Sequence, residues 1–175
     1  MIRKIAISGM VAALYAVLTI ALSPISFGPV QFRAAEALTL LPFFMPEAIP
    51  GLFIGCFLSN MAGGYGLIDI LVGSTATLAA GWLTYKMPNI WAAAVPPVLV
   101  NAVLVGTYLG ILTETPVIYS VIYIGISQAV ICFCLGIPLC MLIASRTEIF
   151  DREMLARRKV KKWLTAEKKK TGANH

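Results

Sequence analysis

Long apolar stretches alternate with short polar breaks along the chain from its start to about residue 145. Proline, glycine, asparagine and charged residues mark the breaks, and these residues interrupt helices and form turns. Four of the stretches reach about 18 residues or more, close to the roughly 20 residues that an α-helix needs to cross a bilayer. The pattern therefore predicts six helices, two of them short, at about 5–22, 31–44, 50–61, 67–86, 91–112 and 117–145.

The composition places these helices in lipid. Of 175 residues, 59% are hydrophobic and only 13% are charged, whereas about a quarter of a soluble domain is charged. One small soluble core cannot bury that much apolar surface. We therefore expect an all-α, six-helix transmembrane bundle over residues 1–145, followed by a basic cytoplasmic tail over residues 146–175, with no repeat or second domain.

The first apolar stretch, MIRKIAISGMVAALYAVLTIALSP, has the basic start and apolar run of a secretory signal peptide. The run continues for about 18 residues, however, and no small-x-small cleavage site precedes a polar mature chain. Further apolar stretches follow it. We interpret this stretch as the first membrane helix.

The basic residues predict the orientation. The net charge is +6, and of the 14 Lys and Arg residues only Arg33 and Lys86 lie outside residues 1–4 and 146–170. Six crossings that begin inside place both termini and Lys86 in the cytoplasm, so that only Arg33 departs from the positive-inside rule. The charge thus indicates a multi-pass protein of the cell membrane in contact with anionic lipid, not a nucleic-acid-binding protein. The tail either lies on the lipid headgroups or docks on a partner.

Cysteine and histidine give no sign of a metal site. Cys56, Cys132, Cys134 and Cys140 lie inside apolar stretches without a CxxC motif, and His175 is the only histidine. Metal sites need several such ligands at fixed spacing. We expect the cysteines to be small buried apolar residues, and we expect no metal or other cofactor.

Two charged residues, Arg33 and Glu36, interrupt an apolar stretch at the second predicted helix. A charged group at the centre of a membrane span costs about 2.5–3.5 kcal/mol on insertion scales, so it usually has a partner or a function. Three residues apart on one helix, the two side chains could form an ion pair with each other. Alternatively, both line a cavity and bind a polar solute, since a carboxylate accepts paired N–H donors and arginine offers a planar set of donors.

Other polar and aromatic residues in the apolar stretches suggest the rest of such a cavity. Asn101 and Gln128 lie about 11 or 12 residues from the outer ends of their helices, which corresponds to a depth of about 17 Å. Interhelical hydrogen bonding would also explain these two amides and Asn60. The cavity interpretation predicts one outward-open pocket formed by Arg33, Glu36, Asn60, Asn101, Tyr108, Glu114, Tyr119, Tyr123 and Gln128.

Two further acidic residues have simpler explanations. Asp69 starts the fourth predicted helix on the outer side and could cap it. Glu47 lies between Pro46 and Pro50 on the inner side. There we expect it to be a helix N-terminal acid or a contact for a partner, not a ligand of the solute.

Small residues recur along the first predicted helix. Ser8, Ala12 and Ala16 follow one another at four-residue spacing, and Gly9 and Ala13 lie beside them. Such a flat face lets another helix approach closely. The approaching helix could belong to this bundle or to a separate protein.

Enzyme motifs are absent from the sequence. It contains no Walker A motif, no HExxH, no GxSxG, and no histidine in the apolar region to act as a base. We therefore do not expect an enzyme. If the chain moves a solute uphill, the energy must come from an ion gradient or from another subunit.

The string FRAAEALTLLPF, followed by PEAIPGLFIGC, resembles the S components of energy-coupling factor (ECF) transporters of the QueT type. Segment 25–80 carries most of this likeness, and the number of helices, the small size and the basic tail extend it over about residues 3–145. Members of this family bind precursors of queuosine. The resemblance implies that the chain is the substrate-binding membrane subunit of an ECF-type ABC importer.

The resemblance also implies partners and a way of working. S components bind their solute from outside under the loop between the first two helices, here SPISFGPVQ, and reorient in the membrane to release it. They work with a transmembrane coupling protein and two cytoplasmic ATPase subunits. In the family, an Ala-x-x-x-Ala stripe on the first helix contacts the coupling protein, and Ala12 and Ala16 match that stripe.

The implied solute is queuine or a related deazaguanine base, which has adjacent N–H donors on a guanine-like edge. We expect Glu36 or Glu114 to accept those donors. Asn101 and Gln128 would read the carbonyl edge of the base. The side chains that could stack on its ring are Tyr108, Tyr119 and Tyr123.

Two other classes of protein fit the composition. A stand-alone secondary transporter of a small polar heterocycle or vitamin would show an inverted repeat or helices broken at the midplane. The sequence shows no such repeat, although Pro96 and Pro97 could break one helix. A structural membrane protein would need no solute site at all.

Overall fold

The computed structural model describes residues 2–28 and 31–145, and every regular element within these ranges is a helix. The helical segments begin and end close to the predicted positions, because the breaks in the apolar pattern are also the breaks in the helices. The predicted tail at 146–175 lies outside the described residues. The elements are α1 (Ile2–Ala21), α2 (Ser23–Ser26), η1 (Ala34–Phe43), α3 (Ala48–Gly63), α4 (Gly66–Ile68), η2 (Asp69–Gly73), α5 (Ser74–Lys86), α6 (Ile90–Ala93), α7 (Val95–Val100), η3 (Asn101–Val105), α8 (Gly106–Leu112), α9 (Val117–Val130), η4 (Ile131–Gly136) and α10 (Ile137–Ser145).

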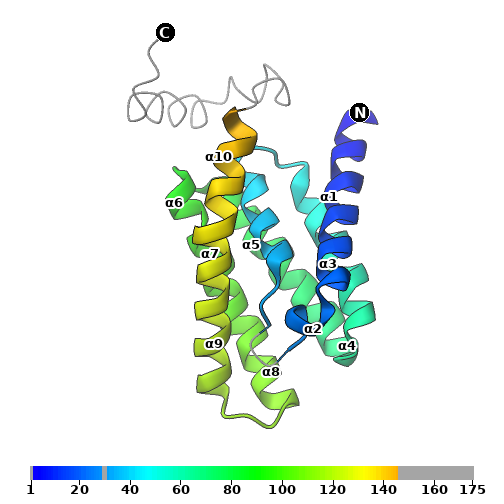
Figure 1. Cartoon of the computed structure of the whole chain (residues 1–175), viewed down its shortest axis with the longest axis vertical. Coiled ribbons are helices and arrows are strands. Elements are labelled where there is room, and N and C mark those ends of the chain that lie inside the picture. The colour runs from blue at the N-terminus through cyan, green and yellow to red at the C-terminus, as the bar shows by residue number, and fades with distance from the viewer. Residues whose placement is uncertain (1, 29–30, 146–175) are drawn as a thin grey trace.

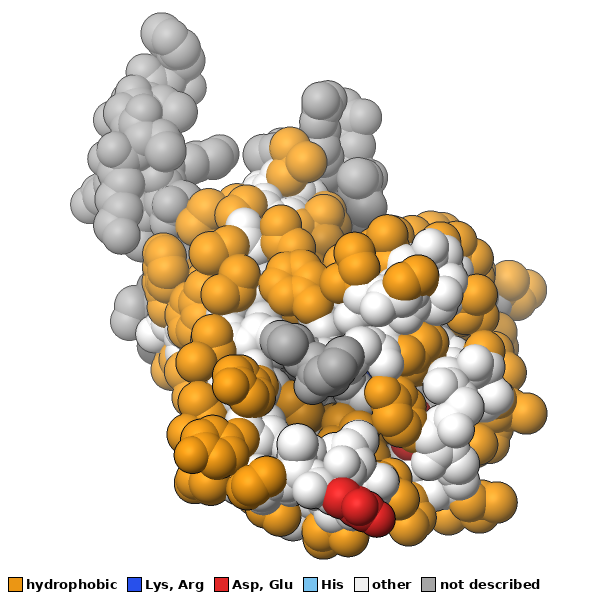
Figure 2. Space-filling model, turned by 60° about the horizontal axis from the view of Figure 1, so that its bottom comes forward, with side chains coloured by type: hydrophobic (Ala, Val, Ile, Leu, Met, Phe, Trp, Pro, Cys, Tyr) orange, Lys and Arg blue, Asp and Glu red, His pale blue; other side chains and the backbone are white. Residues whose placement is uncertain are grey.

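The helices form an elongated bundle in which the start of α1 and the end of α10 lie at the same end (Figure 1). The helices α4 and α8 lie toward the opposite end, and hydrophobic side chains cover most of the face seen in Figure 2. Two shorter apolar helices, η1 and α3, accompany four segments that are long and apolar enough to span a membrane. The chain is therefore a membrane protein whose described residues form only helices, and six crossings stay a prediction. The four long segments are Ile2–Ala21, Gly66–Lys86, Ile90–Leu112 and Val117–Ala144.

The helix η1 lies inside the bundle, and its residues from Ala35 to Phe43 are all buried. It is a 3₁₀-helix, which rises about 2.0 Å per residue, so its length is about 20 Å instead of the about 15 Å of an α-helix. Apolar side chains from η1, α1, α3, η4 and α10 form the main core around it. A smaller core joins α5, η3, α8 and α9. The polar groups of η1 are thereby held away from lipid.

Close packing of α1 on α3 uses part of the small-residue face. A Cβ atom on Gly51 would lie 2.4 Å from the backbone oxygen of Ser8, and one on Gly55 would lie 2.8 Å from that of Ala12. The face at Ser8 and Ala12 is therefore internal packing, and Ala12 is only 6% exposed. For these two residues the approaching helix belongs to this bundle, and docking of a separate protein on the rest of the stripe stays a prediction. The remaining three are exposed or half-buried: Gly9, Ala13 and Ala16.

Glu47 joins the start of α1 to the start of α3. Its backbone oxygen accepts a hydrogen bond of 2.6 Å from the hydroxyl of Ser8, and its carboxylate forms an ion pair of 3.4 Å with Lys4. Glu47 immediately precedes the first residue of α3. This position agrees with the predicted helix N-terminal acid.

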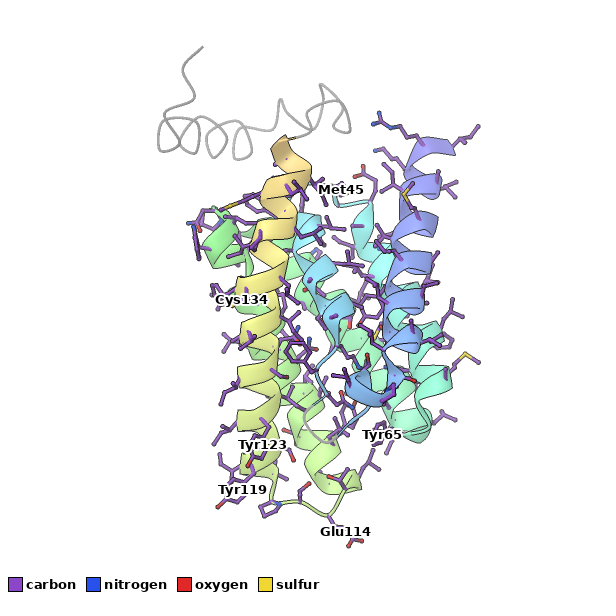
Figure 3. All side chains as sticks on the ribbon, in the orientation of Figure 1. Met45, Tyr65, Glu114, Tyr119, Tyr123 and Cys134 are labelled. Carbon is purple, nitrogen blue, oxygen red and sulfur yellow. The ribbon has the colours of Figure 1, made fainter. Side chains whose placement is uncertain are left out.

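Exposed aromatic side chains lie toward both ends of the long helices. Tyr119 and Tyr123 are 56% and 53% exposed and lie toward the end that carries Glu114 (Figure 3). At the other end of the long segments, Trp82 is also exposed, and the ammonium of Lys86 lies 3.4 Å from the centroid of its ring. Tryptophan and tyrosine are enriched where membranes meet water. These side chains therefore have the positions of interfacial anchors.

Candidate functional site

Glu36 lies at the centre of a polar cluster inside the bundle and is only 3% exposed. One of its carboxylate oxygens accepts a hydrogen bond from the hydroxyl of Tyr15 on α1. The other accepts hydrogen bonds from Asn101 Nδ2 at 3.2 Å and from Gln128 Nε2 at 3.0 Å. These donors replace the water that a carboxylate loses on burial. Three helices thus hold one carboxylate in a fixed position on η1.

Arg33 is close to Glu36 in sequence but bonds to other residues. Its Nη1 donates to Asn60 Oδ1 at 2.7 Å, and its Nη2 lies 3.7 Å from Asp69 Oδ1. Arg33 has extended backbone angles, φ −90° and ψ 97°, just before η1, so it does not share a helix face with Glu36. Within residues 2–28 and 31–145 no ion pair joins Arg33 to Glu36. The predicted self-contained ion pair is therefore wrong.

Asp69 is fully buried and belongs to the same cluster as Arg33. Its carboxylate accepts a hydrogen bond from the hydroxyl of Tyr108, and its backbone oxygen accepts one of 2.9 Å from Asn60 Nδ2. The start of η2 carries no side-chain cap hydrogen bond. The Asp69 carboxylate therefore contacts side chains of other helices, and helix capping does not explain this role.

Three long segments change from α to π geometry next to polar residues of this cluster. The π segment η2 begins at Asp69, and η3 begins at Asn101. The third, η4, begins at Ile131, three residues after Gln128. A π turn is rare, occurs often at functional sites, and rotates the side chains on either side of it relative to each other. These turns give the polar side chains positions that a regular α-helix would not give.

A hollow of about 290 Å³, its open mouth included, lies beside Glu36. It is formed by the start of η1 and by α5, η3 and α9 with their flanking residues. Its lining residues are Gln31, Arg33, Glu36, Gly73, Thr77, Asn101, Val105, Ile124 and Gln128.

Several polar atoms of the lining are available to a ligand. Gln31 Nε2 and Arg33 Nη2 are buried but donate no hydrogen bond to any described residue. Asn101 and Gln128 use their amide nitrogens to bond Glu36, which leaves their carbonyl oxygens as acceptors. Buried polar groups are almost always paired, with protein or with a bound molecule. The arrangement therefore suits a ligand that has both donors and acceptors.

The structure brings together most of the predicted pocket residues but not all of them. Arg33, Glu36, Asn101 and Gln128 line the hollow. Asn60 and Tyr108 lie behind the lining residue Gly73, since a Cβ atom on it would lie 2.6 Å from Asn60 Nδ2 and 3.6 Å from the hydroxyl of Tyr108. Three candidates are exposed and do not reach the lining (Figure 3): Glu114, Tyr119 and Tyr123.

Some residues of the site were not among the sequence-based candidates. Tyr15, Gln31, Gly73 and Thr77 either bond to Glu36 or line the hollow. Tyrosine, threonine and glycine occur commonly in apolar helices, so their presence gives no signal. Gln31 has a positive φ of 45°, which sequence reasoning about helices does not anticipate.

Within the described ranges, no group of three His, Cys, Asp or Glu residues could hold a metal ion. Cys56, Cys132 and Cys140 are buried as expected, whereas Cys134 is exposed. The expectation for Cys134 is wrong because an apolar helix in lipid buries only part of its circumference, and Cys134 lies on the part that faces outward.

Comparisons with known proteins agree on one family. A family model described as "QueT transporter" matches residues 5–145, which is most of the chain. A protein from Lactococcus lactis subsp. cremoris (strain MG1363), named "Queuosine precursor transporter QueT", is 44% identical over 70 residues, and this match covers 39% of the present chain and 41% of that protein. The matched segment thus spans about two fifths of the relative. No solved structure matches the chain.

Proposed function

Since the chain belongs to the QueT transporter family, a family of transporters and not of enzymes, we propose that it binds a queuosine precursor, a deazaguanine base, as the S component of an ECF-type importer. The hollow beside Glu36 is the binding site for this base. The observation that carries the proposal is the buried Glu36 carboxylate, which faces a small polar hollow from the centre of the bundle.

The contacts around Glu36 suit the edge of a deazaguanine base. Such a base has two adjacent N–H donors, on N1 and on the 2-amino group, next to a carbonyl oxygen. Glu36 accepts one of these donors, because a carboxylate has about four lone-pair positions and the protein occupies three of them, and the other donor bonds to the carbonyl oxygen of Asn101 or Gln128. Arg33 Nη2 and Gln31 Nε2 donate to the carbonyl oxygen.

The other lining residues have supporting roles in this proposal. Asn101 and Gln128 already donate to Glu36, so they hold the carboxylate in position instead of reading the carbonyl of the base. Val105 and Ile124 offer apolar contacts to the ring. They replace the tyrosines expected to stack on it, since Tyr119 and Tyr123 face outward.

The proposed topology has six crossings, with both termini in the cytoplasm. It is supported by the common end shared by the start of α1 and the end of α10 (Figure 1) and by the basic residues Arg3, Lys4 and Lys86. Energy comes from a transmembrane coupling protein and two cytoplasmic ATPase subunits. The sequence itself contains no nucleotide-binding motif that could supply it.

Gly73→Ala should weaken binding of a deazaguanine base at least about tenfold, or about 1.4 kcal/mol. The added Cβ would lie 2.6 Å from Asn60 Nδ2, so the methyl group both enters the lining and displaces Asn60. Isothermal titration of the purified chain measures the effect. Gly9→Ala is the matched control, since its Cβ would have no neighbour within 4 Å. Equal affinities of the two variants would place the base away from Gly73.

Ala13→Leu should abolish uptake and leave binding of the base within about twofold of the unmodified chain. Ala13 is exposed on α1, and a larger side chain there would separate α1 from the coupling protein. Uptake of labelled base by cells, together with titration of the purified variant, measures both properties. Ala62→Leu, at an exposed position on α3, is the control. Normal uptake by Ala13→Leu would show that this face is not the docking surface.

Two measurements test the proposed function as a whole. The purified chain should bind queuine or a related deazaguanine with sub-micromolar affinity and should not bind riboflavin, thiamine or biotin. Uptake should stop when the ATPase subunits are deleted. Failure to bind any deazaguanine would refute the substrate, and uptake by this chain alone would instead favour a stand-alone secondary transporter.

A further inference from the structure

The helix α1 is held in the bundle by few buried residues. Only four of its 20 described residues are buried: Val11, Ala12, Tyr15 and Thr19. Val11 and Ala12 have apolar side chains, and the hydroxyl of Thr19 donates to the backbone oxygen of Tyr15 at 2.9 Å. The hydroxyl of Tyr15, in contrast, donates to Glu36 on η1. Tyr15 is therefore the buried polar side chain through which α1 reaches the binding carboxylate.

Tyr15 holds Glu36 from outside the hollow, since Glu36 lines the hollow and Tyr15 does not. The Tyr15 side chain is fully buried, and a Cβ atom on Gly55 of α3 would lie 2.8 Å from the Tyr15 Cβ, so close packing leaves it little room to move. Its hydroxyl bonds to one oxygen of Glu36, and the amides of Asn101 and Gln128 donate to the other. Without the hydroxyl, one carboxylate oxygen would lose the donor that fixes it. The orientation of the carboxylate therefore depends on α1.

A second contact joins the same part of the chain to Arg33. The short helix α2 follows α1, and the backbone oxygen of its Ser26 accepts a hydrogen bond of 3.4 Å from Arg33 Nε. The guanidinium of Arg33 also lies 5.0 Å from the centroid of the Phe27 ring. Arg33 lines the hollow, as Glu36 does. The segment from α1 to Phe27 thus contacts both charged residues of the described lining, so a ligand that shifts these residues would shift the segment with them.

We propose that Tyr15 is a positioning residue that couples α1 to the hollow: it orients the Glu36 carboxylate for the base, and binding of the base in turn holds α1 more firmly in the bundle. Such a coupling is reciprocal, because a contact that changes the affinity for the base must respond to the base by the same free energy. This inference rests on the proposed function, since it takes the hollow as the binding site of the base. The helix that responds is also the one whose exposed residue Ala13 contacts the coupling protein in the proposed function.

A double-mutant cycle tests whether Tyr15 acts through Glu36. Tyr15→Phe removes the hydroxyl and keeps the ring, and isothermal titration of the purified full chain with queuine should show at least about fivefold weaker binding. In the Glu36→Gln background the same change should alter the affinity less than about twofold, because the carboxylate that Tyr15 orients is gone. Tyr108→Phe is the matched control, since its hydroxyl also donates to a buried carboxylate, that of Asp69. Its effect should be the same in both backgrounds.

Hydrogen exchange of the backbone amides tests the effect of the base on α1. In the unmodified chain, saturation with queuine should slow exchange in α1 at least about threefold, although none of the described residues of α1 lines the hollow. In Tyr15→Phe, saturation with queuine should leave exchange in α1 unchanged. A purely structural role of Tyr15 would instead weaken binding equally in both backgrounds and leave the response of α1 intact.

Each outcome decides the proposal. Equal losses from Tyr15→Phe in both backgrounds, or the same dependence on Glu36 for Tyr108→Phe, would overturn the role of Tyr15 and leave the binding site in place. Unchanged exchange in α1 on binding would overturn the coupling. If Tyr15→Phe does not fold, exchange in the unmodified chain decides alone: slower exchange in α1 supports the coupling, and unchanged exchange contradicts it. Absence of binding by the unmodified chain would refute the proposed function, and the inference with it.

Discussion

Glu36→Gln should weaken binding of a deazaguanine base by about 1.5–3 kcal/mol, which is about 10- to 150-fold. Glutamine has nearly the same shape, but it replaces one acceptor oxygen by an N–H donor and removes the charge. That donor would face Tyr15, Asn101 or Gln128, which all donate to the carboxylate in the native protein. Isothermal titration of the purified variant gives the affinity directly.

Glu114→Gln is the matched control for this substitution. Glu114 was the other carboxylate that could accept the donors of the base, but it is exposed at the end of the bundle (Figure 3). We expect its affinity to stay within about twofold of the unmodified chain. The reverse pattern would be a loss of affinity with Glu114→Gln and none with Glu36→Gln. That result would place the binding site at the loop after α8.

Gly55→Ala should destabilise the protein by about 1–3 kcal/mol, because overfilling a close contact forces helices apart. The added Cβ would lie 2.8 Å from the backbone oxygen of Ala12 and 2.8 Å from the Cβ of Tyr15. Since Tyr15 donates to Glu36, the variant should also bind the base more weakly. Thermal unfolding of the detergent-solubilised protein and titration of the base measure the two effects.

Gly9→Ala separates this steric effect from the general effect of the substitution. Both glycines lie in helices, so both variants gain the same helix propensity of about 1 kcal/mol. The Cβ at Gly9 would have no neighbour within 4 Å, so we expect no loss of stability there. A Gly55→Ala variant as stable as Gly9→Ala would mean that α1 and α3 do not pack closely at this point.

The apolar pattern was sufficient to predict where the helices lie. Membrane helices consist of long apolar segments, and the residues that end them, such as Pro24, Pro46 and Pro88, are recognisable in the sequence. The pattern could not predict the geometry within a helix. The 3₁₀ geometry of η1 and the three π segments depend on packing against neighbouring helices. The order of apolar residues along the chain does not reveal this packing.

Burial cost correctly indicated four polar side chains that lie together in the structure. Arg33, Glu36, Asn101 and Gln128 are polar side chains in apolar segments, and all four line the hollow. Of the two alternatives for Arg33, the ion pair with Glu36 is wrong, because the three-residue spacing assumed an α-helix where the backbone is extended.

The tyrosines show a second limit of sequence reasoning. Depth along a helix follows from residue count, but the direction of a side chain depends on how the helix is rotated. Apolar residues surround α9 on every side, so the sequence does not reveal which face meets lipid. Tyr119 and Tyr123 were therefore assigned to the pocket although they face outward.

The most direct test is a structure of the protein with a bound deazaguanine base. We expect the base between η1, α5, η3 and α9, with N1 or the 2-amino group within about 3.2 Å of the Glu36 carboxylate and its carbonyl oxygen near Arg33 or Gln31. A base bound at the exposed end near Glu114, Tyr119 and Tyr123, without contact to Glu36, would contradict this.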